Sequence, residues 1–77
     1  MFRAEDIAAL TQRRPFRPFR IHMADGSHVD VRHPELAMIM KDRMIVGLPS
    51  DRPGIVDDYE YCAILHITRL EELVDAS

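Results

Sequence analysis

The chain has 77 residues, of which 47% are hydrophobic and 30% charged, with a formal net charge of −3. This composition is typical of one small globular domain and argues against a disordered chain. The sequence contains no run of about 20 apolar residues, which a membrane-spanning helix needs, so we expect no membrane association.

The cysteine content and the N-terminus predict the compartment. Cys62 has no second cysteine with which to form an internal disulfide, which is typical of a reducing environment. No apolar segment follows basic residues at the start of the chain, so we expect no secretory signal. We predict a cytoplasmic protein with a single domain over residues 1–77.

Charge is distributed unevenly along the chain. Residues 1–20 carry five Arg against two acidic residues, whereas residues 51–77 carry two Arg against seven. A nucleic-acid-binding protein is more often basic overall, because phosphate neutralisation supplies much of the affinity. We therefore expect the basic end to lie against the acidic end of the same chain or of a neighbouring subunit.

The first predicted element is an amphipathic helix over residues 4–13. Glu5 and Asp6 lie in its first turn, where the helix dipole favours negative charge, and Ile7 and Leu10 form an apolar stripe. Pro15 prevents its continuation. About three turns are too short to be stable alone in water, so the helix is expected to pack on a sheet.

A hairpin of residues 17–23 and 27–33 follows, and its register can be predicted. Its apolar residues are odd-numbered in both strands, so they share one face only if the turn has an odd number of residues. A three-residue turn over positions 24–26, with Gly26 at positive φ, meets this condition. The predicted pairs are Phe19–Val31, Ile21–Val29, Arg20–Asp30 and His22–His28.

Pro34 ends this hairpin, and the remaining sequence predicts strands over residues 36–40, 44–48, 55–61 and 67–70. The first two form a hairpin around residues 41–43, and a short 3₁₀ turn is expected within residues 62–66. The almost continuous apolar runs between residues 36 and 48 predict that both faces of this hairpin are covered. The charged residues 71–77 are expected to form a C-terminal tail.

These elements predict an α+β fold. A short N-terminal helix packs on a strongly bent antiparallel five-stranded sheet over residues 17–70, or on a small barrel. The order of elements is similar to that of Sm-like and SH3-like barrels, in which closure removes exposed strand edges.

Two segments resemble a family of short uncharacterised bacterial proteins. They are RPFRPFRIHMADGSHVDVRHPE at residues 14–35 and LHITRLEEL at residues 65–73. The pattern of that family is a short helix, RPFxPFRI, a DG turn, VxHPE and a terminal strand similar to LHITRIE. The family has no assigned activity, so the resemblance implies no catalytic residues. Residues 36–48 depart from the pattern, because they contain more methionine.

Histidine and carboxylate side chains offer little support for catalysis. His22, His28 and Asp30 share one face of the predicted hairpin and could contribute ligands to a divalent metal ion or a small metal-dependent enzyme. Arginines crowd the same face, however, and no HxxxH or HExxH spacing is present. We therefore predict exposed polar residues there, no catalytic residues, no metal and no cofactor.

The arginine- and phenylalanine-rich segment is a candidate for contact with single-stranded RNA or a protein partner. Its candidate residues are Arg13, Arg14, Phe16, Arg17 and Arg20. The alternative, which we favour, is that Phe16 and Phe19 anchor the core while the arginines pair with carboxylates. Those carboxylates would be Asp57, Asp58, Glu60 or the tail.

The methionine-rich hairpin is the candidate for self-association, because Met is common at adaptable interfaces. Its residues are Met38, Met40, Met44 and Ile45. We therefore predict a non-enzymatic module that binds itself or another protein. An Sm-like protein that binds single-stranded RNA through residues 13–20 is the alternative.

Overall fold

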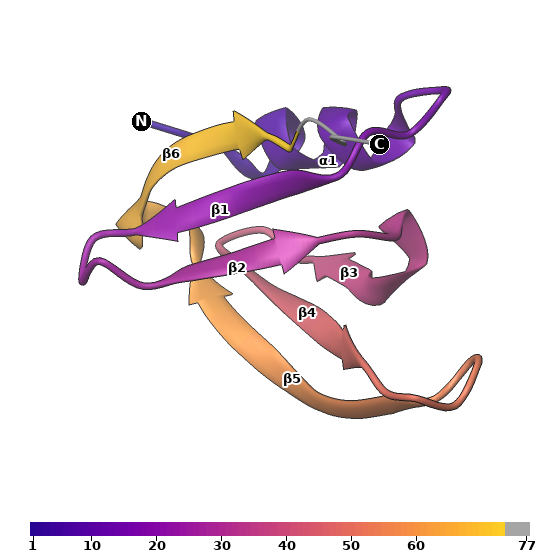
Figure 1. Cartoon of the computed structure of the whole chain (residues 1–77). Helices are drawn as coiled ribbons and strands as arrows, with labels where there is room; N and C mark the ends of the chain where they lie inside the picture. The colour runs from indigo at the N-terminus through magenta and orange to yellow at the C-terminus, as the bar shows by residue number, and fades with distance from the viewer. Residues whose placement is uncertain (74–77) are drawn as a thin grey trace.

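The computed structural model describes residues 1–73 as one helix followed by six strands (Figure 1). The elements are α1 (Ala4–Gln12), β1 (Phe19–Met23), β2 (His28–Val31), β3 (Ala37–Ile39), β4 (Arg43–Pro49), β5 (Val56–Ala63) and β6 (Ile67–Glu72). The strands form two antiparallel sheets of three, ordered β2-β1-β6 and β3-β4-β5. The predicted α+β class is confirmed, and all six predicted strand segments are present, but they form two sheets of three strands and not one bent five-stranded sheet.

The chain passes between the sheets at two short 3₁₀ turns. η1 (Pro34–Leu36) joins β2 to β3, and η2 (Ile64–His66) joins β5 to β6. Pro34 suits the first position of such a turn, because its fixed φ is helical and its missing N–H would have no partner there. The predicted interruption at Pro34 and the 3₁₀ turn before the last strand are both confirmed.

Hydrophobic side chains from the helix and both sheets meet between the layers. The fully buried large residues include Ile7 of α1, Phe19 and Ile21 of β1, and Met44 and Val46 of β4. Burial of this apolar surface is the main force that holds the layers together. The sheets diverge toward the far ends of β4 and β5, which extend away from this core (Figure 1).

Helix α1 is one residue shorter than predicted. The Asp6 carboxylate accepts a hydrogen bond of 2.8 Å from the backbone N–H of Arg3, which satisfies a donor at the helix N-terminus. Ile7 is the buried residue of the predicted stripe, and Leu10 is partly buried beside it. Within residues 1–73, no helix has the length and apolar character needed to cross a membrane.

The β1–β2 hairpin has the predicted register. Phe19 lies opposite Val31, Ile21 opposite Val29, Arg20 opposite Asp30, and His22 opposite His28. Gly26 has φ of 90°, and its N–H donates to the carbonyl of Met23 at 3.0 Å. The Met23 N–H donates to the Ser27 carbonyl at 2.8 Å, which closes the three-residue turn.

Strand β6 pairs with the other edge of β1 and corrects the predicted tail. Glu71 lies opposite Arg20, and Glu72 lies opposite Phe19. Both glutamates were expected in the charged tail, but they belong to β6, where Arg13 and Arg17 pair with Glu72 and His22 pairs with Glu71. Residues 74–77 of the predicted tail lie outside the described residues.

The second sheet has one face in the core and one face on the outside. Ala37 pairs with Val46 and Ile39 with Met44, and these positions face inward. The intervening row, Met38 opposite Ile45, faces outward. The connection of β3 to β4 is tighter than predicted, because Met40 N–H donates to the Arg43 carbonyl at 2.7 Å across a two-residue turn.

Candidate interaction surfaces

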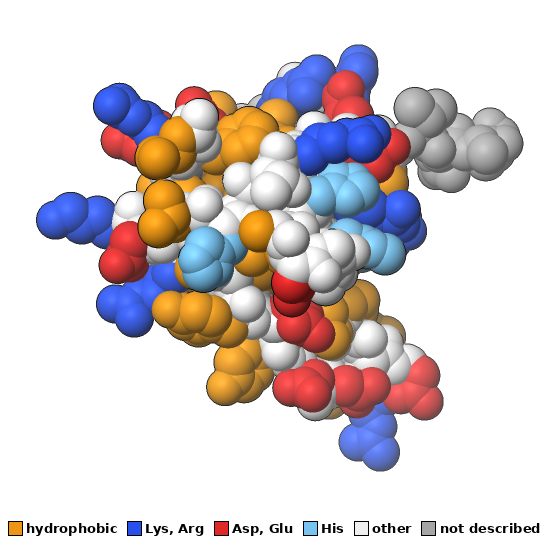
Figure 2. All heavy atoms as spheres, turned by 90° about the vertical axis from the view of Figure 1, so that its left-hand side faces the viewer, with side chains coloured by type: hydrophobic (Ala, Val, Ile, Leu, Met, Phe, Trp, Pro, Cys, Tyr) orange, Lys and Arg blue, Asp and Glu red, His pale blue; other side chains and the backbone are white. Residues whose placement is uncertain are grey.

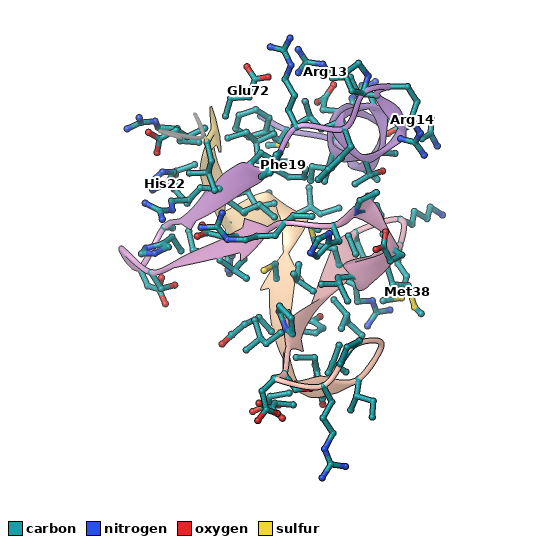
Figure 3. All side chains as sticks on the ribbon, turned by 45° about the vertical axis from the view of Figure 1, so that its right-hand side comes forward. Arg13, Arg14, Phe19, His22, Met38 and Glu72 are labelled. Carbon is teal, nitrogen blue, oxygen red and sulfur yellow. The ribbon has the colours of Figure 1, made fainter. Side chains whose placement is uncertain are left out.

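Two arginines of the RPFxPFRI segment share one carboxylate. Arg13 Nη1 lies 3.0 Å and Arg17 Nη1 lies 3.5 Å from Glu72 Oε1 of β6. Figure 3 shows Arg13 and Glu72 on the same side of the molecule, while Arg14 points away beside the end of the helix. The basic segment is therefore partly neutralised within the chain.

Arg14 and Arg20 have different surroundings. Arg14 Nη1 donates to the backbone carbonyls of Arg13 at 2.8 Å and Thr11 at 3.1 Å. Arg20 makes a two-pronged pair with Asp30, with Nε–Oδ1 at 2.7 Å and Nη2–Oδ2 at 3.1 Å. The acidic partners of Arg13, Arg17 and Arg20 are thus Glu72 and Asp30.

The phenylalanines of the segment belong to the core or its border. Phe19 is 1% exposed, and Phe16 is partly buried against it with ring centroids 6.2 Å apart in an edge-to-face arrangement. Phe19 has no free ring face on which a nucleotide base could stack. The expectation that both rings anchor the core agrees with this packing.

The histidine pair lies on the outer face of the first sheet, as the register predicts. His22 and His28 have ring centroids 6.2 Å apart, and His22 Nε2 lies 2.9 Å from Glu71 Oε1. This hydrogen bond is the main cause that lowers the pKa of Glu71. The imidazole of His22 is therefore engaged with a carboxylate of β6 that the sequence analysis did not identify.

Asp30, the third candidate ligand, is held by arginine. The hydrogen bonds from Arg20 lower the pKa of Asp30, and Arg32 Nη2 lies 3.5 Å from Oδ2. A carboxylate paired in this way has little capacity left for a cation. In the part of the chain that the structure describes, no group of three or more His, Cys, Asp or Glu is placed to hold a metal ion.

A hollow of about 550 Å³ lies between the turn of the first hairpin, β5 and η2, and it collects polar side chains. Asp25 Oδ1 accepts hydrogen bonds from the Ser27 hydroxyl at 2.5 Å and from the Ser27 N–H at 2.9 Å. These bonds lower the pKa of Asp25, which weakens it as a base. The Asp25–Ser27 pair stabilises the turn through local hydrogen bonds.

Cys62 is a core residue. It is 2% exposed, and burial raises the pKa of its thiol. A protonated, buried thiol is a poor nucleophile, so its main contribution is to packing.

The outward row of the second sheet is the main exposed apolar surface among the described strands. Met38, Ile45 and Tyr61 lie directly opposite one another across β3, β4 and β5, and Tyr59 lies two residues from Tyr61 on the same face. Met38, Tyr59 and Tyr61 are 63%, 61% and 57% exposed, respectively. We call these four residues the tyrosine face; Met38 points outward from β3 in Figure 3.

The tyrosine face revises the predicted set of self-association residues. Met44 is wrong as a contact residue, because it is fully buried opposite Cys62. Met38 and Ile45 are outward-facing, and Met40 is partly buried opposite Arg43. The two tyrosines were not predicted as contact residues, although the spacing Tyr59-x-Tyr61 in a strand places them on one face.

Comparisons with family models, curated proteins and solved structures found no match to this chain. The resemblance carried by residues 14–35 and 65–73 stays a prediction.

Proposed function

We propose that this chain is a non-enzymatic protein-interaction module and that the tyrosine face is its contact surface. The observation that carries the proposal is the row of exposed apolar side chains on one sheet face. Isolated exposed hydrophobic residues are common on monomers, but a contiguous row that includes two tyrosines is typical of an interface. The lone, buried Cys62 is consistent with action in the reducing cytoplasm.

RNA binding through Arg13, Arg14, Phe16, Arg17 and Arg20 has less support. Three of these arginines already pair with Glu72 or Asp30, which partly neutralises the segment, and the net charge of the chain is negative. Binding of a single-stranded RNA that weakens steeply with salt and disappears in Arg14→Glu plus Arg17→Glu would favour the RNA function instead.

The test uses the full chain purified from the cells that produce it, with a mild chemical crosslinking step. The proteins that stay bound to the purified chain, including further copies of it, are quantified by mass spectrometry. The measurement is made for three forms of the chain. These are the wild type, the Met38→Ser plus Tyr61→Ser variant, and His28→Ser, a control at an exposed strand position of the first sheet.

We expect a stoichiometric retained protein with the wild type and the control, and its loss with the double variant. Thermal unfolding of each form verifies that the fold persists. Retention that survives the double substitution, or no retained protein with the wild type, would contradict the proposal.

A further inference from the structure

The tyrosine face is flanked by opposite charges. At one end, the turn from β3 to β4 carries two basic residues, Lys41 and Arg43, and one acidic residue, Asp42. Asp42 Oδ1 lies 3.2 Å from Arg43 Nε. At the other end, Asp57 and Asp58 follow Val56 at the start of β5, and both are exposed. Figure 2 shows acidic side chains gathered at the lower end of the molecule, with exposed hydrophobic side chains nearby.

Strand register places these charges on the ribbon that carries the tyrosine face. Arg43 lies opposite Ala63 and has the same outward parity as Ile45. Asp57 is the extra residue where the register shifts between Leu48 and Pro49, close to the far end of the ribbon. Along β4 and β5, the ribbon therefore runs from a basic end, through the apolar tyrosine face, to an acidic end.

We propose that the occupant of the tyrosine face is a second copy of this chain, packed face to face about a two-fold axis that runs across the strands. This inference rests on the proposed function. Rotation about such an axis reverses the strand direction, so Arg43 of one copy approaches Asp57 of the partner subunit, and the reciprocal contact forms at the other end. Tyr59 and Tyr61 then pack against the same residues of the second copy.

The charges select this arrangement over two others. A two-fold axis parallel to the strands would bring the acidic end of one copy onto the acidic end of the other. An edge-to-edge antiparallel pairing of β5 centred on Tyr59 would place Asp58 directly opposite Glu60 of the partner subunit. Like charges directly opposite are unfavourable, and charged side chains are a common protection of a free strand edge.

The apolar middle and the charged ends have different tasks in this dimer. The tyrosines and Met38 lose the most exposed surface, so they supply most of the affinity. The charges at the rim are solvated and mainly determine which orientation is adopted. A charge reversal should therefore weaken the dimer, and the compensating reversal should restore it.

The experiment is sedimentation equilibrium of the full chain with Arg43→Glu, Asp57→Arg and the two substitutions combined. Each single variant should weaken dimerisation roughly tenfold, since each substitution acts twice in a symmetric dimer. The combined variant should return to within about threefold of the wild type. Arg14→Glu, at a side chain that donates hydrogen bonds to backbone carbonyls at the end of the helix, is the matched control and should leave the dimer unchanged.

Three results would contradict, separately, the second copy as occupant, the two-fold arrangement and the tyrosine face as contact surface. A wild type that remains monomeric at about millimolar concentration overturns the second copy as occupant. The proposed function survives that result if another protein is retained through Met38 and Tyr61. A dimer that the combined variant does not rescue overturns the two-fold arrangement, and a dimer that persists in Met38→Ser plus Tyr61→Ser overturns the tyrosine face itself.

Discussion

Gly26 occupies a backbone conformation that side chains with a Cβ atom adopt only at a cost. Its φ is 90°, while a Cβ atom built there would have no heavy atom within 4 Å. The cost of substitution is therefore one of backbone strain and not of collision.

We predict that Gly26→Val lowers the free energy of unfolding by about 1–2 kcal/mol, because valine resists positive φ in a turn fixed by two strands. Gly54 also has positive φ, at 78°, and equally open space. It lies in the exposed loop before β5, which can rearrange, so Gly54→Val should cost less. Urea denaturation measures both variants, and equal losses would contradict the explanation.

Asp30 connects stability to pH, because the hydrogen bonds from Arg20 lower its pKa in the folded state. A carboxyl group with a lowered folded pKa contributes stability that is complete above its unfolded pKa of about 3.9 and is lost as pH falls through the folded value. We predict that the unfolding free energy decreases in acid below about pH 4, and that Asp30→Asn reduces this slope. Thermal melts across pH provide the measurement, with Asp51→Asn in the exposed loop as the control.

At the scale of the elements, burial holds α1 in place more firmly than ion pairs do. Ile7 is fully buried, whereas the Arg13–Glu72 pair joins two side chains that are each 42% exposed. Large-to-small substitution in a core costs several kcal/mol, while an exposed ion pair contributes between nothing and about 1 kcal/mol.

We therefore predict that Ile7→Ala lowers the free energy of unfolding by about 3 kcal/mol and Glu72→Gln by less than about 1 kcal/mol. Chemical denaturation of the two variants under the same conditions makes the comparison. A larger loss with Glu72→Gln would show that the ion pairs, and not the apolar contact, fix the helix.

The elements differ in how far the sequence could predict them. In the first hairpin, Phe19, Ile21, Val29 and Val31 alternate with polar residues, so parity determines both the buried face and the turn. The second hairpin lacks that alternation. Met44 faces inward and Ile45 outward because of where the first sheet lies. The apolar run itself does not indicate that position, so the buried face could not be predicted from it.

The partner of Arg13 and Arg17 was equally hard to predict, because Glu72 lies far away from both in the sequence. Glu71 and Glu72 follow Leu70 in a charged segment, and isolated charged segments at a chain end are commonly tails. Only the pairing of β6 with β1 brings Glu71 opposite Arg20 and Glu72 near Arg13. The charge imbalance between the two ends of the chain predicted such compensation, and the tail was among the expected partners, but Glu72 itself could not be singled out.

At the scale of the whole molecule, the sequence predicted the class and order of elements better than their grouping. The 3₁₀ turns at Pro34 and Ile64 divide the strands into two sheets, so a prediction of one bent sheet could not separate the outward residues of β3, β4 and β5 from the buried ones. Those outward residues form the face on which the proposed function depends.

The divergence of the two sheets has a consequence for motion. Every residue from Asp51 to Tyr61 is exposed, so the far ends of β4 and β5 are held together mainly by their own ladder. Backbone amides there should exchange with deuterium through local opening, well before those of β1, which lies between two neighbours beneath the core. Slower exchange at raised protein concentration, confined to this ribbon, would be the signature of its protection by another molecule.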